Sequence, residues 1–172
     1  MKPYVRGKSI FLREVEIDDA QFILDLRTDV ERSKYLSVTT GSVEAQRAYI
    51  QRYKESLTDY YFIICDWNGK AQGTIRIYDI QDKSFCWGSW ITTSDAPPGT
   101  AIESALLIYD FAFFSLHYAG AHFDVRKQNE RVVDFHKRFG ARVVSEDELN
   151  YYFRYSRDDY LRTREKYRRY LP

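Results

Sequence analysis

The sequence is poor in cysteine, with only Cys65 and Cys86. They do not form a Cys-x-x-Cys pair, and none of the three histidines lies at metal-ligand spacing from either of them. A disulfide framework or a zinc site needs more of these residues at closer spacing. We therefore expect neither a disulfide scaffold nor a bound metal.

Long hydrophobic runs are also missing. No stretch approaches the roughly 20 apolar residues that a transmembrane helix needs. Residues 1–8 are charged where a secretory leader would be apolar. Internal repeats and Gly/Ser/Pro-rich linkers do not occur. We expect one domain over residues 1–172, located in the cytoplasm and with no membrane partner.

Net charge is low, because 26 basic residues balance 25 acidic residues to give +1. Such a balance produces no overall field that would attract nucleic acid. The segment 156–172 is the exception, with six Lys/Arg, three acids and interleaved tyrosines. That composition suits nucleic-acid backbone contacts and stacking. We favour instead a terminal helix that packs its tyrosines on the domain, and expect no nucleic-acid partner.

Aromatic residues are abundant, at 17% of the chain with 15 tyrosines and 11 phenylalanines. They indicate either a tyrosine-rich core and surface or a pocket lined by aromatic rings.

The hydrophobic pattern predicts an α+β fold. Alternating apolar residues predict about seven strands. These are expected at residues 7–15, 60–66, 73–78, 85–93, 121–125, 142–144 and 151–155. Helical spacing predicts about four helices plus a C-terminal one. These are expected at 20–29, 42–53, 99–116 and 129–139, with a capping box of Ser156 and Asp159 opening the tail helix in 156–172. In the second helix, we expect Ala45, Ala48, Tyr49 and Tyr53 to share one face. The early strands form a meander and the later ones alternate with helices, so the sheet should be mixed and mostly antiparallel.

The junction at residues 94–104 has the character of an anion site. A strand ends, Pro97 and Pro98 follow, and a helix begins near Gly99 and Ala101. The first N–H groups of a helix lack internal partners, and the helix dipole favours negative charge there. The alternative is an ordinary helix start after a turn.

A second junction is marked by Asn129, His136 and Gly140. Asn129 stands where a strand gives way to a helix, and its amide can bond both backbone and ligand. His136 shares an apolar stripe with Val132 and Phe139, so it faces inward. On these grounds alone, His136 is better explained as a core residue than as a functional one.

Together the two junctions resemble the acetyl-CoA-binding core of the GNAT superfamily of N-acetyltransferases. The matching segments are 99–113, GTAIESALLIYDFAF, and 123–141, FDVRKQNERVVDFHKRFGA. The superfamily has a Q/R-x-x-G-x-G/A loop at a helix start, then a valine-ended strand, an Asn, a Tyr seven residues on and a Gly four beyond. Gly99, Ala101, Val125, Asn129 and Gly140 match that pattern.

The resemblance covers roughly residues 8–155. The segments IFLREV (10–15) and DDA (18–20) are similar to the branch that contains ribosomal-protein N-acetyltransferases. It implies a single-domain GNAT fold and acetyl transfer from acetyl-CoA to a primary amine. The partner would be a small-molecule amine acceptor, with no metal, and the enzyme a monomer or homodimer.

The resemblance also implies the binding residues. Acetyl-CoA would lie where the fourth and fifth predicted strands splay apart, with pantetheine added to the fourth like an extra strand. The residues implied are Trp90, Ile91 and Thr92 for pantetheine, and Pro98, Gly99, Thr100, Ala101 and Asn129 for the rest of the cofactor. A backbone N–H would polarise the acetyl carbonyl, and the amine would attack directly.

Three positions depart from the superfamily pattern. Ala96 replaces the Gln or Arg of the loop, which leaves phosphate binding to backbone amides. His136 replaces the Tyr that acts as acid toward the CoA thiolate, and we expect it to take that role. Cys86 stands near the usual glutamate base. Asp79 and Asp124 are alternative carboxylates for the amine proton, and the sequence does not rank them.

For the acceptor, we expect the amino group of a nucleotide-linked amino sugar. Residues 84–90 resemble a strand of acetyltransferases that act on 4-amino-6-deoxy sugar nucleotides. Aromatic rings suited to stacking are Tyr60, Tyr61, Tyr78, Trp87 and Trp90, and arginines suited to a diphosphate are Arg32, Arg47, Arg52 and Arg76. The alternatives are a protein N-terminal amine or, from another class, a non-catalytic CoA-binding module.

Overall fold

A computed structural model describes residues 4–29, 34 and 41–172. Within them, eight strands form one sheet in the order β1-β2-β3-β4-β5-β6-β8-β7. The strands are β1 (Tyr4–Arg6), β2 (Ile10–Glu14), β3 (Tyr60–Asp66), β4 (Ala71–Gln81), β5 (Ser84–Thr92), β6 (Gly120–Arg126), β7 (Arg142–Glu146) and β8 (Asn150–Ser156). The α-helices are α1 (Ala20–Thr28), α3 (Val43–Lys54), α4 (Thr100–Asp110), α5 (Glu130–Arg138) and α6 (Arg157–Lys166).

The α+β class and the mixed, mostly antiparallel sheet are confirmed, because only the β5–β6 pairing is parallel. The strand count is one higher than predicted. The additional strand, β1, is an edge strand of three residues that pairs with β2 across a turn closed by the Gly7 N–H and the Ile10 carbonyl (2.9 Å). It is too short to show an alternating pattern.

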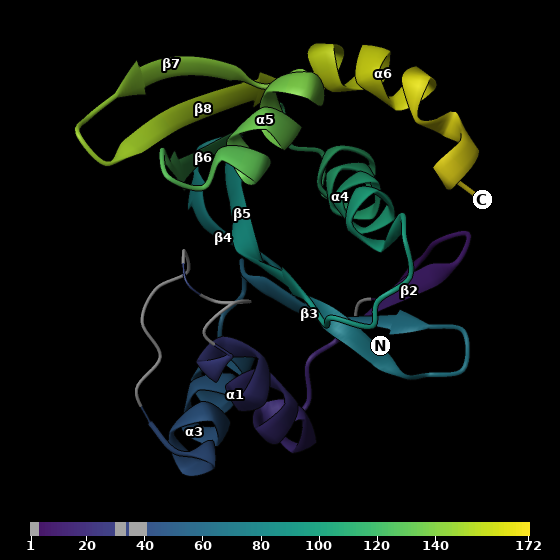
Figure 1. The fold of residues 1–172 in the computed structure, drawn as a ribbon, viewed down its shortest axis with the longest axis vertical. Helices are drawn as coiled ribbons and strands as arrows, with labels where there is room; N and C mark the ends of the chain where they lie inside the picture. Colours follow the sequence, from purple (N-terminus) through teal and green to yellow (C-terminus); the bar gives the residue numbers. More distant parts are fainter. Residues whose placement is uncertain (1–3, 30–33, 35–40) are drawn as a thin grey trace.

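Helices cover the two faces of the sheet (Figure 1). Helices α4 and α5 enclose the larger core against the inward residues of β3 to β6 and β8, such as Phe62, Ile77 and Phe153. Helices α1 and α3 enclose a smaller core on the opposite face, against Tyr61 and Ile63 of β3. Side chains alternate between the two faces along a strand, so β3 contributes Phe62 and Ile64 to the larger core and Tyr61 and Ile63 to the smaller one.

The predicted inner face of α3 is wrong in part. Ile50 and Tyr53 are buried, whereas Ala45 and Ala48 are exposed. Tyr53 sets this orientation, because its hydroxyl accepts the Tyr61 N–H (2.9 Å) and donates to the Glu14 carboxylate (3.1 Å). The helix cap was predicted correctly: the Ser42 hydroxyl accepts the Ala45 N–H at 3.2 Å.

The tail segment packs on the domain. Ser156 caps α6 as predicted, accepting the Asp159 N–H at 3.0 Å. On the inner side of α6, the Tyr160 hydroxyl donates to the Leu106 carbonyl at 3.1 Å. Beyond α6, Tyr167 stacks on Phe139 with ring centroids 5.1 Å apart. No helix in the part of the chain that the structure describes is long and apolar enough to cross a bilayer.

Two irregularities in β5 shape the region that follows. First, β5 and β6 pair at only two positions, Ser84–Gly120 and Phe85–Ala121, and then diverge. Second, the β4–β5 register shifts between Thr74 and Arg76 of β4. The extra residue is on β5, where Ser89 lies within the bulge with φ +47°, and the Thr74 hydroxyl holds it by donating to the Ser89 carbonyl (2.6 Å).

Candidate active site

A cleft of about 1020 Å³ lies where β5 and β6 diverge. Its lining comes mainly from β5, β6, the first turn of α4, and α5 with the residues just before it. Six of the predicted site residues line it: Trp90, Ile91, Thr92, Ala101, Asn129 and His136. Three others, Pro98, Gly99 and Thr100, lie outside the lining that the described residues form. The two sequence junctions are therefore brought together around one cavity.

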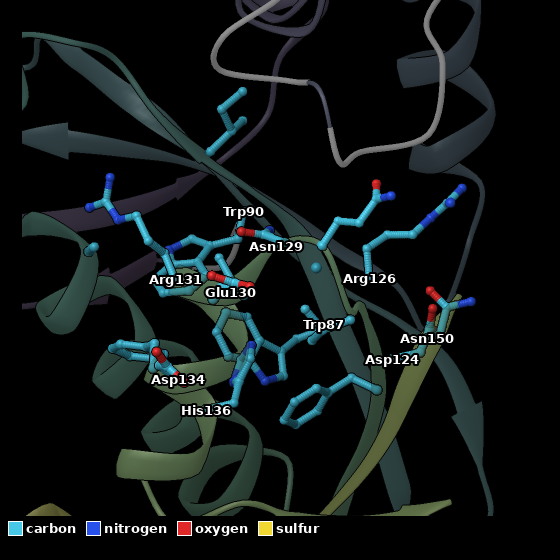
Figure 2. Close-up of a pocket in the computed structure, with 18 of the residues that line it drawn as sticks. Trp87, Trp90, Asp124, Arg126, Asn129, Glu130, Arg131, Asp134, His136 and Asn150 are labelled. Carbon is cyan, nitrogen blue, oxygen red and sulfur yellow. The ribbon is translucent and has the colours of Figure 1, made fainter. Parts of the chain in front are cut away.

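The floor of the cleft is aromatic (Figure 2). Trp87 and Trp90 have ring centroids 5.1 Å apart, and Trp90 lies 5.0 Å from Phe135. Each indole N–H is satisfied, that of Trp87 by the Tyr109 hydroxyl (2.9 Å) and that of Trp90 by the Ser104 hydroxyl (3.0 Å). These bonds fix both rings, so the floor is preformed. Of the aromatic residues proposed from sequence for the acceptor, only these two tryptophans line the cleft.

His136 is part of this floor. It is 5% exposed and lies 4.4 Å from Phe123 and 5.4 Å from Trp87, ring to ring. Its Nδ1 is buried with no hydrogen-bond partner among the described residues. Burial lowers the pKa of His136 to about 3. The imidazole is therefore neutral at pH 7, and the acid role predicted from sequence lacks the required pKa near working pH.

The N-terminus of α4 offers two open amides. Gly99 caps the helix with φ +91°, a conformation that suits glycine. The Thr100 N–H donates to the Pro97 carbonyl (3.2 Å) and the Glu103 N–H to the Gly99 carbonyl (2.9 Å). Of the first four helical N–H groups, those of Ala101 and Ile102 remain without a partner in the described chain. The sequence did not predict a contact between this helix start and the tail. A ring carbon of Tyr170 lies 3.2 Å from where a Cβ of Gly99 would be, so the Tyr170 ring covers Gly99.

Asn129 is held by its backbone rather than by its side chain. Its carbonyl accepts the Val132 and Val133 N–H groups (3.1 and 3.0 Å), and its N–H donates to the Arg126 carbonyl (3.0 Å). The side-chain amide makes no cap hydrogen bond within the described residues. It lines the cleft and keeps its donor and acceptor for a ligand.

Arginines line the cleft, but not those predicted. Arg32 lies outside the described residues. Arg47 pairs with Glu44, Arg52 lies over the Tyr49 ring and Arg76 pairs with Asp59, and none of the three lines the cleft. The cleft arginines are Arg126 of β6 and Arg131 and Arg138 of α5. None of these three forms an ion pair with a residue that the structure describes. Arg126 was not predicted, although it directly follows Val125 at the end of the valine-ended strand, where the charged pair Arg126 and Lys127 was a signal that could have identified it.

Cys86 is neither a base nor a nucleophile at neutral pH. It is 5% exposed, and burial raises the pKa of its thiol to about 11. A thiol with that pKa stays protonated at pH 7, so this residue does not supply a thiolate for an acyl-enzyme.

The two carboxylates proposed from sequence differ in position. Asp124 lines the cleft. Asp79 does not line it as far as the described residues define it, and its Oδ2 lies 3.2 Å from His122 Nε2. The Nδ1 of the same histidine lies 2.6 Å from the Ser84 hydroxyl. This Ser–His–Asp arrangement lies outside the cleft lining, and we assign it no role in acetyl transfer.

Comparison with known proteins identifies the family. A model of the acetyltransferase (GNAT) domain matches residues 9–142. The structure of apo FdhC, described as a nucleotide-linked sugar GNAT, is 36% identical, with full coverage of both chains and a TM-score of 0.91. A GCN5-related N-acetyltransferase from Brucella melitensis is 14% identical, with 100% of this chain and 86% of that chain covered, and a TM-score of 0.82. An acetyltransferase from Bacillus anthracis is 14% identical, with 91% and 99% covered, and a TM-score of 0.78.

The latter two similarities show a shared fold only. No curated protein sequence matches the chain. The domain model covers well over half of the chain and includes both junctions that form the cleft. This chain therefore belongs to the GNAT acetyltransferase family.

Proposed function

We propose that this enzyme transfers the acetyl group of acetyl-CoA to the amino group of a nucleotide-linked amino sugar. One observation carries the choice of acceptor: the full-length similarity to FdhC at 36% identity. The cleft supports it. Tryptophan faces suit a sugar or base, and arginines that form no ion pair with the residues that the structure describes suit a diphosphate.

Acetyl-CoA occupies the side of the cleft next to α4 in this proposal. Its pantetheine arm runs along Trp90, Ile91 and Thr92, where β4 still pairs with one edge of β5 but the edge that faced β6 has no strand partner among the described residues. Its diphosphate lies at the α4 N-terminus formed by Pro98, Gly99, Thr100 and Ala101, and Asn129 bonds a polar group of the arm. The open amides of Ala101 and Ile102 support this placement, because an anion at a helix start meets unpaired N–H groups and a favourable dipole.

Transfer is direct in this proposal, without an acyl-enzyme. The amine attacks the thioester carbon, a backbone N–H beside the β5 bulge stabilises the oxyanion, and CoA leaves as a thiolate. The protonated thiol of Cys86 supports a direct route. Correct placement of amine and thioester supplies much of the acceleration in such reactions.

His136 takes a revised role. A neutral imidazole carries one N–H, and Nδ1 is buried without a partner in the described structure. We assign the N–H to Nε2, where it donates a hydrogen bond to the CoA sulfur rather than a proton. Activity then shows no loss between pH 6 and 8 from deprotonation of His136, whereas an imidazolium acid would lose activity there as pH rises.

An acceptor screen tests the proposal. The enzyme, taken as a cytoplasmic monomer or homodimer, is incubated with acetyl-CoA and nucleotide-linked amino sugars, free amino sugars, polyamines or N-terminal peptides, and CoA release is followed. We expect turnover with at least one nucleotide-linked amino sugar, and at least tenfold lower kcat/KM for the same sugar without its nucleotide. Turnover of peptides with none of any nucleotide-linked sugar would reverse the assignment.

A further inference from the structure

The arginines of the cleft lie on two separate walls. Arg131 and Arg138 belong to α5, whereas Arg126 is the last residue of β6. Figure 2 shows Arg126 and Arg131 on opposite sides of the opening, with Trp90 and Asn129 between them. The cleft therefore offers two places for an anionic group. The proposed reaction brings two such groups, the diphosphate of acetyl-CoA and that of the acceptor.

The α5 wall adjoins the start of α4. Trp90 connects the two helices, because its indole N–H donates to the Ser104 hydroxyl of α4 (3.0 Å) and its ring lies 5.0 Å from Phe135 of α5. An anion on this side meets the open amides at the α4 N-terminus, where the proposed function places the diphosphate of acetyl-CoA. The second anion then needs the other wall.

The charges of the two walls differ. On α5 the two arginines of the lining are balanced by two acids, Glu130 and Asp134. Among the described lining residues outside α5, the cations are Lys34 and Arg126 and the acid is Asp124. This part of the cleft therefore has a surplus of positive charge, which favours a diphosphate there.

Sheet pairing fixes Arg126 without using its side chain. Val125 before it is buried in the larger core, and successive side chains of a strand alternate, so Arg126 points out of that core. In the β6–β8 register Arg126 is opposite Asn150, which also lines the cleft. The guanidinium is exposed and forms no hydrogen bond or ion pair with any residue that the structure describes. It keeps all its N–H donors for a ligand.

The neighbouring cation is already engaged. Lys127 Nζ lies 3.4 Å from Glu146 Oε2 and 5.1 Å from the centroid of the Tyr151 ring. Lys127 is not part of the lining that the described residues form. Of the two adjacent cations at the end of β6, Lys127 therefore contacts the β7–β8 hairpin and Arg126 is available to a ligand.

We propose that Arg126 binds the diphosphate of the acceptor, on the wall opposite the one that receives acetyl-CoA. This inference rests on the proposed acetylation of a nucleotide-linked amino sugar. The planar guanidinium donates to two phosphate oxygens at once. The two diphosphates are thereby held apart, while the amine and the thioester meet over the aromatic floor. Arg126 is then the residue that selects a nucleotide-linked sugar over the free sugar.

The test compares Arg126→Gln and Arg126→Lys with the matched control Lys127→Gln, which removes the same charge from the next residue. Uridine, thymidine and guanosine diphosphates are titrated by calorimetry into each protein with CoA at saturation, so that the CoA site is occupied. The values of kcat and KM are then measured for acetyl-CoA, for the nucleotide-linked amino sugar accepted in the screen and for the same sugar without its nucleotide. Melting temperatures confirm that each variant is folded.

We expect Arg126→Gln to weaken the tightest-bound nucleoside diphosphate about 30-fold and to raise the acceptor KM by a similar factor, as for a hydrogen bond to a charged group. The KM for acetyl-CoA and kcat/KM for the sugar without its nucleotide should stay within threefold of wild type. Arg126→Lys keeps the charge but loses the two-pronged contact, so its loss should be about fivefold. Lys127→Gln should stay within threefold in every assay.

Several results overturn the inference. One is a diphosphate affinity of Arg126→Gln within threefold of wild type, and another is an equal loss in Lys127→Gln. A raised KM for acetyl-CoA with unchanged diphosphate binding would assign Arg126 to CoA instead. The inference also fails if the wild type binds none of the three diphosphates. If the wild type binds a diphosphate through Arg126 but acetylates no nucleotide-linked sugar, the proposed function fails and the diphosphate site at Arg126 stands.

Discussion

Burial of His136 predicts an acid-labile fold. In the unfolded chain a histidine has a pKa of about 6.5. In the native state the surrounding rings lower the pKa of His136 to about 3. A depressed native pKa stabilises the fold above pH 6.5, and this contribution is lost as pH falls from 6.5 toward 3. At pH 5 the unfolded imidazole is about 97% protonated and the native one about 1%. The linkage amounts to about 2 kcal/mol lost between pH 7 and pH 5.

Urea unfolding at pH 7 and pH 5 measures this difference. The pH-linked loss should disappear in His136→Phe, because phenylalanine fits the aromatic surroundings and does not titrate. Only the change between the two pH values is compared, so any packing cost of the variant cancels. His117→Asn is the control: His117 is exposed with φ +62°, which asparagine tolerates, and the variant should keep the wild-type loss. An equal loss in wild type and His136→Phe would show that His136 is not neutral and buried as described.

Three further variants test other parts of the structure. Ala101→Glu places a carboxylate at the open end of α4, where Ala101 is exposed, and should raise the KM for acetyl-CoA about tenfold with the melting temperature unchanged; an unchanged KM would move the phosphate site elsewhere. Cys86→Ser should keep kcat within threefold of wild type, and iodoacetamide at pH 7 should leave activity intact; a complete loss in both would indicate an acyl-enzyme. Asp110→Asn weakens contacts to Arg164 (2.9 and 3.0 Å) and the Tyr160 hydroxyl, and should lower the unfolding free energy by about 2 kcal/mol in urea titrations; no change would mean that these contacts do not hold α6 in place.

The elements that sequence predicted well have local signals. Helix α4 has a Pro-Pro-Gly start and an apolar stripe, and α6 has a cap in Ser156 that the structure retains. Gly140 ends α5 as expected, with φ +103°. Such features depend on neighbours within one or two turns, which a sequence displays directly.

The features that could not be predicted from the sequence depend on contacts between segments that are far apart in the chain. The low pKa of His136 results from rings on β5, β6 and β8, none of which is near it in sequence. Arg126 meets Asn150 only because β8 inserts between β6 and β7. Tyr170 covers Gly99 because the tail folds back over α4. The sequence did not distinguish Asp79 from Asp124. In the structure Asp79, at a register shift between Tyr78 and Gln81 of β4, lies beside His122, whereas Asp124 of β6 lines the cleft.

The cleft residues suggest which step of the proposed reaction is assisted most. A neutral His136 on the aromatic floor would offer the leaving thiolate a hydrogen bond but no positive charge, so departure of CoA would be assisted weakly. Proton removal from the amine would then contribute more, and Asp124 is the cleft carboxylate that β6 supplies, whereas Glu130 and Asp134 belong to α5. If deprotonation is this important, acceptors with a lower amine pKa should retain more activity in Asp124→Asn at pH 7, because a larger share is already free amine. A panel of acceptors with graded amine pKa values would give a slope near −1 in log kcat/KM for the variant. A slope near zero in the variant would mean that proton removal does not limit this enzyme.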